Sequence, residues 1–175
     1  ASRYRDIGAG LRQPERDAAP RPAPHALLHG AATIDAVELN PQLVRLVAER
    51  FSAFAGHLYE RPGVRVHVTE ARSFVAGGRN RYDVIQIPLL DSFAAAAAGT
   101  HSLSESYVYT IEAFEQYLDR LRPGGYLAIT RWLKLPPRDS LRLFATAVSA
   151  PERRGSGEPG RHLALVRSWN TTTLL

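Results

Sequence analysis

IDAVELNP, residues 34–41, joins a strand pattern directly to a helix start. The mostly apolar run Ile34–Leu39 predicts a short strand. Asn40 then supplies an N-cap side chain, and Pro41 takes the first helical position, where its missing N–H group costs nothing. The residues beyond predict a helix to about residue 55 that covers a sheet with one apolar face, formed by Leu43, Val44, Val47, Phe51 and Phe54.

Further strand patterns follow at intervals along the chain. Residues 64–68 predict a second strand, residues 83–87 a third and largely buried one, and residues 126–130 a fourth. A closing strand pair is expected over residues 162–166 and 171–175. Because helical patterns alternate with most of these strands, we predict an α/β fold with a doubly wound, mainly parallel sheet and a C-terminal antiparallel strand pair.

Three further helices are expected between these strands. A short one covers residues 72–76 and stops at the Gly77-Gly78 pair. A second begins after the N-cap residue Thr110 and stops at Pro123-Gly124-Gly125. The last is expected to pack through an apolar face formed by Leu141, Phe144, Ala145 and Val148.

The first 25 residues differ in composition from the rest of the chain. Four prolines lie from Pro14 to Pro24, which excludes a continuous helix over that stretch. Gly8 and Gly10, in the run DIGAG, resemble the Gly-rich turn with which nucleotide-binding α/β folds approach a cofactor. We therefore divide the chain into an irregular segment, residues 1–25, and a folded domain, residues 26–175.

The composition argues against several classes of function. The chain has no cysteine, and its six histidines show no ligand spacing, so no metal site is expected. The formal charge of +5 comes from arginines spread along the whole sequence, which favours a solvated surface over a nucleic-acid interface. No apolar run approaches the roughly 20 residues that span a bilayer, and we expect a cytoplasmic protein with no membrane segment.

Glu38 is the first candidate for a ligand contact. It closes a predicted strand, and in nucleoside-binding α/β folds an acidic residue at such a place accepts hydrogen bonds from both ribose hydroxyls. A strand-end carboxylate could equally cap a helix or face solvent. The strand end alone therefore does not decide between these roles.

Five motifs occur in an order and spacing that resemble spermidine synthases. They are VELNP at 37–41, VRVHVTEARSF at 64–74, RYDVIQIPLLDSF at 81–93, YVYTIEAFEQYLDRLRPGGYLAIT at 107–130 and RHLALVRS at 161–168. The resemblance covers roughly residues 26–175. The segment that ends in LRPGGYL also resembles class I S-adenosylmethionine-dependent methyltransferases, which have the same Rossmann-like fold.

The resemblance implies a site for S-adenosylmethionine or its decarboxylated form. In it, Glu38 binds the cofactor ribose, and Glu70, with the backbone of Ala71, lies beside the adenine. For Glu70 an alternative stays open, because a carboxylate at a helix N-terminus is favourable without any ligand.

Asp91 is the candidate catalytic residue, and its context argues against the family's reaction. Aminopropyl transfer needs a base that keeps the attacking amine neutral, and the family uses the first aspartate of a D-x-x-D pair. Here the pair reads Pro88-Leu89-Leu90-Asp91, so only the second carboxylate remains. Asp91 could anchor an amine substrate, or it could be a capping residue of a loop.

Three functions follow from these residues. The leading one is a spermidine-synthase-like domain that binds S-adenosylmethionine or its decarboxylated form, with doubtful aminopropyltransferase activity. The second is a methyltransferase that acts on a small molecule, and the third is a non-catalytic domain that keeps the fold. The expected partners are a small-molecule amine or another small acceptor, without nucleic acid, and the resemblance also allows a homodimer.

Overall fold

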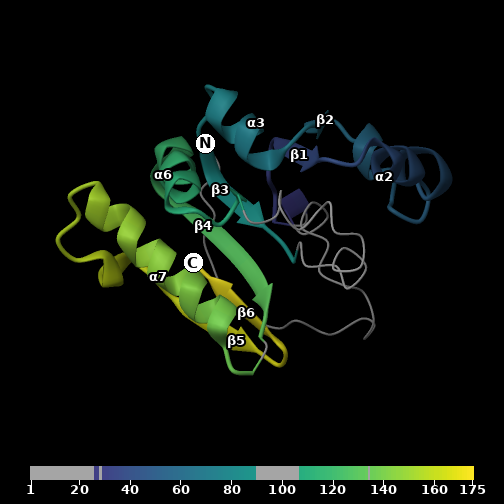
Figure 1. The fold of residues 1–175 in the computed structure, drawn as a ribbon. Helices are drawn as coiled ribbons and strands as arrows, with labels where there is room; N and C mark the ends of the chain where they lie inside the picture. Colours follow the sequence, from purple (N-terminus) through teal and green to yellow (C-terminus); the bar gives the residue numbers. More distant parts are fainter. Residues whose placement is uncertain (1–25, 28, 90–106, 134) are drawn as a thin grey trace. The chain divides into compact units, whose positions relative to one another are not determined.

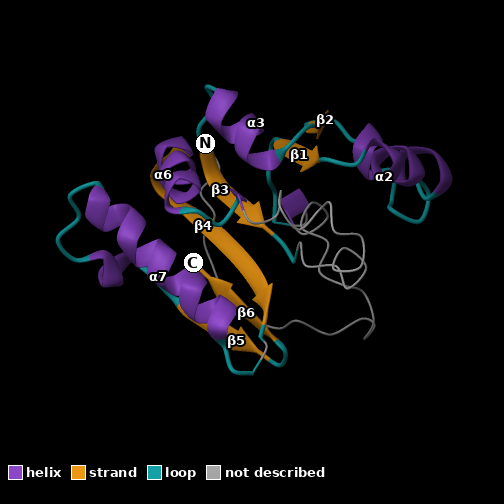
Figure 2. Ribbon diagram, viewed as in Figure 1, coloured by secondary structure: helices purple, strands orange, loops and turns teal. Residues whose placement is uncertain are grey.

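Figure 1 shows a computed structural model of the chain, coloured along the sequence. The structure describes residues 26–27, 29–89, 107–133 and 135–175. Its contacts divide the chain into two compact units, Ala1–Glu70 and Ala71–Leu175, and each is described by itself. Figure 2 shows that both units combine strands with helices, as the alternating sequence pattern predicts.

Two parallel strands form the sheet of the first unit. Strand β1, Ile34–Glu38, pairs in register with β2, Val64–Val68, so that Glu38 lies opposite Val68. Both strands were predicted. On one face of this pair Asp35 accepts hydrogen bonds from Arg65 Nε at 2.8 Å and from His67 Nε2 at 2.9 Å.

The segment after β1 starts as predicted but does not continue as an α-helix. Helix α2 covers only Pro41–Arg45, with the Asn40 side chain accepting from the backbone N–H of Gln42. A π-helix, η1, follows over Leu46–Arg50. Because a π-helix has more residues per turn, it rotates the side chains that follow it away from the face expected for an α-helix.

The predicted apolar face of this segment is only partly correct. Val44 and Val47 are half-buried, as expected of residues that cover a sheet. Leu43, Phe51 and Phe54 are instead exposed, Phe54 by 73%.

Gly63 fixes the turn that leads into β2. The turn follows a short 3-10 helix, η2, over Leu58–Glu60. Gly63 has a φ of +85°, and a Cβ atom added to it would lie 2.5 Å from the carbonyl oxygen of Ala32. Its own carbonyl accepts the Ile34 N–H at 2.8 Å, which aligns the starts of the two strands. The close backbone approach leaves room only for glycine.

The second unit contains a four-stranded sheet in the order β3-β4-β6-β5. Strand β3 pairs parallel with β4, whereas β4–β6 and β5–β6 pair antiparallel. The predicted C-terminal antiparallel pair is thus confirmed. The strands cover Tyr82–Ile87 (β3), Leu121–Trp132 (β4), Leu165–Ser168 (β5) and Thr171–Leu174 (β6).

Strand β4 begins earlier than the sequence predicts. Pro123-Gly124-Gly125 was expected to end a helix, but the helix ends at Arg120 and the glycine pair lies inside the strand. A Cβ atom on Gly125 would lie 3.0 Å from the Tyr82 carbonyl oxygen, so the glycine allows close pairing at a register shift. The prediction of a largely buried β3 was also wrong, because one face of this strand is exposed at Val84 and Gln86.

In the described part of this unit, three α-helices and a short 3-10 helix, η3, Pro159–His162, accompany the sheet. The α-helices are α3, Ala71–Gly77, α6, Ile111–Arg120, and α7, Arg138–Arg153. The predicted N-cap of α6 is confirmed, since Thr110 Oγ1 accepts from the Ala113 N–H at 3.2 Å. At the end of α6 the Arg120 guanidinium donates to the carbonyl oxygens of Val75 and Ala76, both at 3.0 Å, and so closes the last turn of α3.

Helix α7 packs through a different face from the one predicted. Its buried residues are Ser140, Leu143, Ala147 and Ala150, whereas Leu141 and Phe144 are exposed. Small side chains let the helix lie close to its neighbours, and a buried hydrogen bond of 3.0 Å joins the hydroxyls of Ser140 and Thr172. The core of the unit consists of Val75, Ile87, Ala113, Phe114, Tyr117, Ile129, Leu143, Ala147, Ala150 and Leu174.

None of the helices in the described ranges is both long enough and apolar enough to cross a bilayer.

Candidate functional site

The carboxyl ends of β1 and β2 carry two of the predicted site residues. Glu38 is the last residue of β1, and its carbonyl oxygen accepts the N–H of Thr69 at 3.1 Å. Glu70 follows directly and is half-buried. The structure thus brings Glu38 and Glu70 to the same edge of the two-stranded sheet, as expected for the ends of parallel strands.

The Glu38 carboxylate is held by its own chain. Its Oε1 atom accepts the backbone N–H of Asn40 at 2.8 Å. Among the described residues nothing donates to Oε2, and the side chain is half-buried. One oxygen therefore orients the group while the other keeps its lone pairs for a ligand, which is the chemistry needed to accept hydrogen bonds from vicinal hydroxyls.

Asn40 explains why this arrangement follows from the local sequence. Its backbone N–H binds Glu38, while its side chain accepts from Gln42 at 2.9 Å. Pro41 then holds the first helical position. The same three residues thus end the strand, orient the carboxylate and start the helix.

Tyr59 is a neighbour of this site that sequence reasoning missed. It lies in η2, where burial raises the pKa of its phenol above the ordinary 10.0, and the negative charge of Glu38 raises it further. No local sequence pattern links Tyr59 to Glu38. Tyr59 lies in η2, which the turn at residues 61–63 separates from strand β2.

This electrostatic contact gives a measurable expectation. Glu38→Gln should lower the pKa of Tyr59 while leaving it above 10.0, because burial, the larger cause, remains. The measurement is the alkaline titration of phenolate absorbance, with Tyr59→Phe used to subtract the other tyrosines. Glu49→Gln, an exposed change on η1, should leave the titration unchanged. An unchanged Tyr59 titration in Glu38→Gln would show that the two side chains do not interact.

Ala71 is the first residue of α3, and Glu70 directly precedes it. This position suits a carboxylate that favours a helix N-terminus as well as one that contacts a nucleoside. The role of Glu70 and Ala71 beside an adenine therefore stays a prediction.

Gly8, Gly10 and Asp91 lie outside the described residues. Strand β3 ends at Ile87, directly before Pro88, as the proline predicts. The role assigned to Asp91 stays a prediction.

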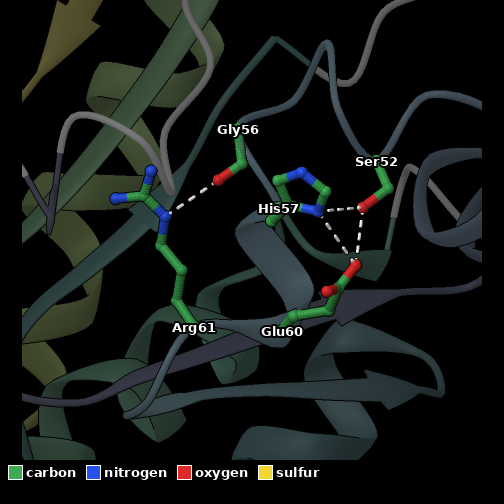
Figure 3. Close-up of polar contacts among 5 residues, drawn as sticks. All are labelled: Ser52, Gly56, His57, Glu60 and Arg61. Atoms are coloured by element: carbon green, nitrogen blue, oxygen red, sulfur yellow. Dashed lines mark hydrogen bonds and ion pairs between the residues drawn. The ribbon is translucent and has the colours of Figure 1, made fainter.

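A second polar cluster, absent from the sequence predictions, lies in the first unit (Figure 3). Ser52 Oγ donates to Glu60 Oε1 at 2.6 Å and lies 3.0 Å from His57 Nδ1. His57 Nδ1 is 3.3 Å from the same Glu60 oxygen. Hydrogen bonds from Ser52 and from His57 hold the pKa of Glu60 below its ordinary 4.5.

Serine, histidine and a carboxylate are the residues of a hydrolase triad, but this geometry is different. In a triad the histidine lies between the other two groups and uses one nitrogen for each. Here both groups face Nδ1, and the serine proton points to Glu60. The arrangement cannot activate the serine as a nucleophile.

Comparisons with known proteins identify the fold. No protein-family model and no curated protein matches the chain. Among solved structures, human methyltransferase-like protein 13 in complex with SAH (S-adenosylhomocysteine) matches with a TM-score of 0.54 and 17% identity, over 81% of this chain and 59% of that chain. The ribosomal protein L11 methylase of Lactobacillus delbrueckii subsp. bulgaricus matches with 0.47 and 14%, over 85% and 59%.

The first of these matches establishes the fold class. The chain has the Rossmann-like α/β fold of methyltransferases, as predicted, and spans about 59% of the length of that human chain. At 17% identity the likeness concerns the fold alone.

Proposed function

We propose that this chain binds S-adenosylmethionine and belongs to an enzyme that transfers its methyl group to a small-molecule acceptor. The observation that carries the proposal is Glu38, which ends β1 with one oxygen fixed by Asn40 and the other unbonded among the described residues. In this fold, that is where a carboxylate holds the ribose of a bound nucleoside. Bound S-adenosylmethionine supplies an electrophilic methyl group.

Further residues are proposed to contact the rest of the cofactor and the acceptor. Glu70 and the Ala71 backbone are proposed to lie beside the adenine, and Gly8 and Gly10 to form the turn that approaches the rest of the cofactor. Asp91 is proposed to bind an amine or other cationic group of the acceptor.

Methyl transfer fits these residues better than aminopropyl transfer. Moving an aminopropyl group to an amine requires a base at the position that Pro88 occupies, and proline has no side chain that accepts a proton. Methyl transfer to an acceptor that is already nucleophilic requires only that the two reactants are held in line. The likeness of the fold to a methyltransferase of known structure supports the same choice.

Calorimetric titration of the purified chain with four nucleosides tests the proposal. S-adenosylmethionine and S-adenosylhomocysteine are expected to bind more tightly than decarboxylated S-adenosylmethionine and methylthioadenosine. Tighter binding of the decarboxylated form would favour the aminopropyl reaction instead. Absence of binding by all four would favour a domain that keeps the fold without the ligand.

We expect negligible formation of spermidine from putrescine and decarboxylated S-adenosylmethionine. A positioned general base contributes about a hundredfold to ten-thousandfold, and the chain lacks it at Pro88. Pro88→Asp should raise the rate without restoring full turnover, because the proline-rich segment at 1–25 also departs from the family pattern. Chromatographic detection of spermidine is the measurement, and robust synthesis by the unmodified chain would contradict the proposal.

A further inference from the structure

We infer that the cluster of Ser52, His57 and Glu60, here called the 52–57–60 cluster, binds one divalent ion of a late first-row transition metal through the side chains of His57 and Glu60. Figure 3 shows the imidazole, the carboxylate and the hydroxyl turned toward one another. Their three nearest atoms lie within 2.6 to 3.3 Å of each other in pairs. The inference is independent of the proposed methyl transfer, and it differs from the sequence-based expectation of no metal site.

The spacing of the two stronger ligands suits a metal chelate. Zinc bound tetrahedrally at about 2.0–2.1 Å holds neighbouring ligand atoms roughly 3.3 Å apart. His57 Nδ1 and Glu60 Oε1 are 3.3 Å apart. A metal ion can therefore replace the proton between these atoms with little movement of either side chain.

The backbone holds the histidine in place before any ion binds. The turns that follow η1 end where Gly56 N–H donates to Ala53 O at 3.0 Å and His57 N–H donates to Ser52 O at 2.8 Å. This pair of bonds is a Schellman motif. His57 then adopts a left-handed conformation with a φ of 52°, unusual for a residue other than glycine. Such strain is often found where a side chain must be held for function.

Among the residues that the structure describes, no arginine pairs with the carboxylate of Glu60. The neighbouring Arg61 directs its Nε to the carbonyl oxygen of Gly56 at 2.9 Å. A second histidine–carboxylate contact in the described part of this unit is different, because Arg65 binds both oxygens of Asp35, at 2.8 and 3.1 Å, beside His67. Of these two histidine–carboxylate pairs in the described part of the unit, only the one in the 52–57–60 cluster has a carboxylate that no arginine holds. That carboxylate can exchange its present partner for an ion.

The donor set selects the class of metal. An imidazole nitrogen with one carboxylate suits Zn²⁺, Ni²⁺ or Cu²⁺, whereas Mg²⁺ prefers oxygen ligands in octahedral geometry. In the described residues no group of three or more His, Asp or Glu side chains could hold a metal ion. We expect water to complete the coordination, and both side chains are more than half exposed, which leaves room for it.

Titration of the purified chain with Zn²⁺, Ni²⁺ and Cu²⁺ tests this inference. We expect one ion per chain, weaker binding in acid because the ion competes with the imidazole proton, and no comparable binding of Mg²⁺. His57→Asn and Glu60→Gln should each weaken binding by about tenfold or more, because each removes one of two strong ligands. Asparagine tolerates the left-handed conformation, and circular dichroism in EDTA verifies that the variants fold.

The control is His162→Asn, which removes an exposed histidine of the second unit and should leave the affinity unchanged. The nitrogen resonances of His57 give a second measurement, since the ion should shift Nδ1 more than Nε2. Unchanged affinity in His57→Asn or Glu60→Gln would overturn the inference. So would an ion that shifts the resonances of another histidine.

Discussion

Glu38→Ala is expected to weaken binding of S-adenosylhomocysteine by about a hundredfold or more while leaving the melting temperature nearly unchanged. A charge-assisted hydrogen bond contributes about 1.5–3 kcal/mol, and the proposed site makes two such bonds to the ribose. Together they correspond to at least roughly two orders of magnitude in affinity. Folding should tolerate the change, because the carboxylate binds only the Asn40 N–H among the described residues.

Calorimetry gives the affinity, and thermal unfolding gives the stability. Glu49→Ala is the matched control, since it removes an exposed glutamate of the same unit from η1. If Glu38→Ala unfolds the protein, the carboxylate has a structural role at the start of α2. If it folds and binds normally, Glu38 does not hold the ribose.

Gly63→Ala should destabilise the first unit by about 3 kcal/mol or more. A left-handed conformation costs an ordinary residue about 1–2 kcal/mol. At Gly63 the added Cβ would also meet the Ala32 carbonyl oxygen at 2.5 Å, so the backbone must move. That movement would break the 2.8 Å hydrogen bond from Ile34 that aligns β1 with β2.

Gly30→Ala separates the two contributions. Gly30 also has a positive φ, of +76°, but a Cβ there would meet nothing within 4 Å. Urea denaturation followed by circular dichroism should therefore show a much smaller loss for Gly30→Ala. Equal losses in the two variants would mean that the turn at Gly63 yields to the added carbon, and that the close approach does not constrain the sheet.

The features that the sequence predicted well are local ones. Asn40 and Thr110 cap their helices through side chains that act within three residues. The strand at 34–38 is a short, mostly apolar run, and the strand at 64–68 alternates apolar with polar residues. Both patterns are visible without information from the rest of the chain.

The incorrect predictions concern features that depend on contacts between residues distant in sequence. The buried face of α7 depends on which side chains fit against the sheet. The small Ala147 is buried there, whereas the larger Phe144 is exposed. The inclusion of Gly124 and Gly125 in β4 depends on pairing with β3, which the sequence does not specify locally. The change from α2 to a π-helix has no sequence signal that we identify.

The same distinction applies to the candidate sites. Glu38 and Glu70 could be predicted because parallel strands bring their carboxyl ends to one edge. The charge of Glu38 acts on the Tyr59 phenol only because of the position that the fold gives η2, and the 52–57–60 cluster depends on the left-handed backbone of His57. A histidine with positive φ is rare enough that sequence reasoning would not assume it.

The hydrogen bonds from the Arg120 guanidinium have a consequence for the local unfolding of helices in the second unit. Helix α3 spans only Ala71–Gly77, and isolated helices of that length do not persist in water. Its last carbonyl groups, at Val75 and Ala76, are bound by a side chain at the end of α6. When α6 unravels from its C-terminus, α3 loses that bond at the same moment. The amide hydrogens of the two helices should therefore exchange with solvent as one cooperative unit, although the sequence places them far apart.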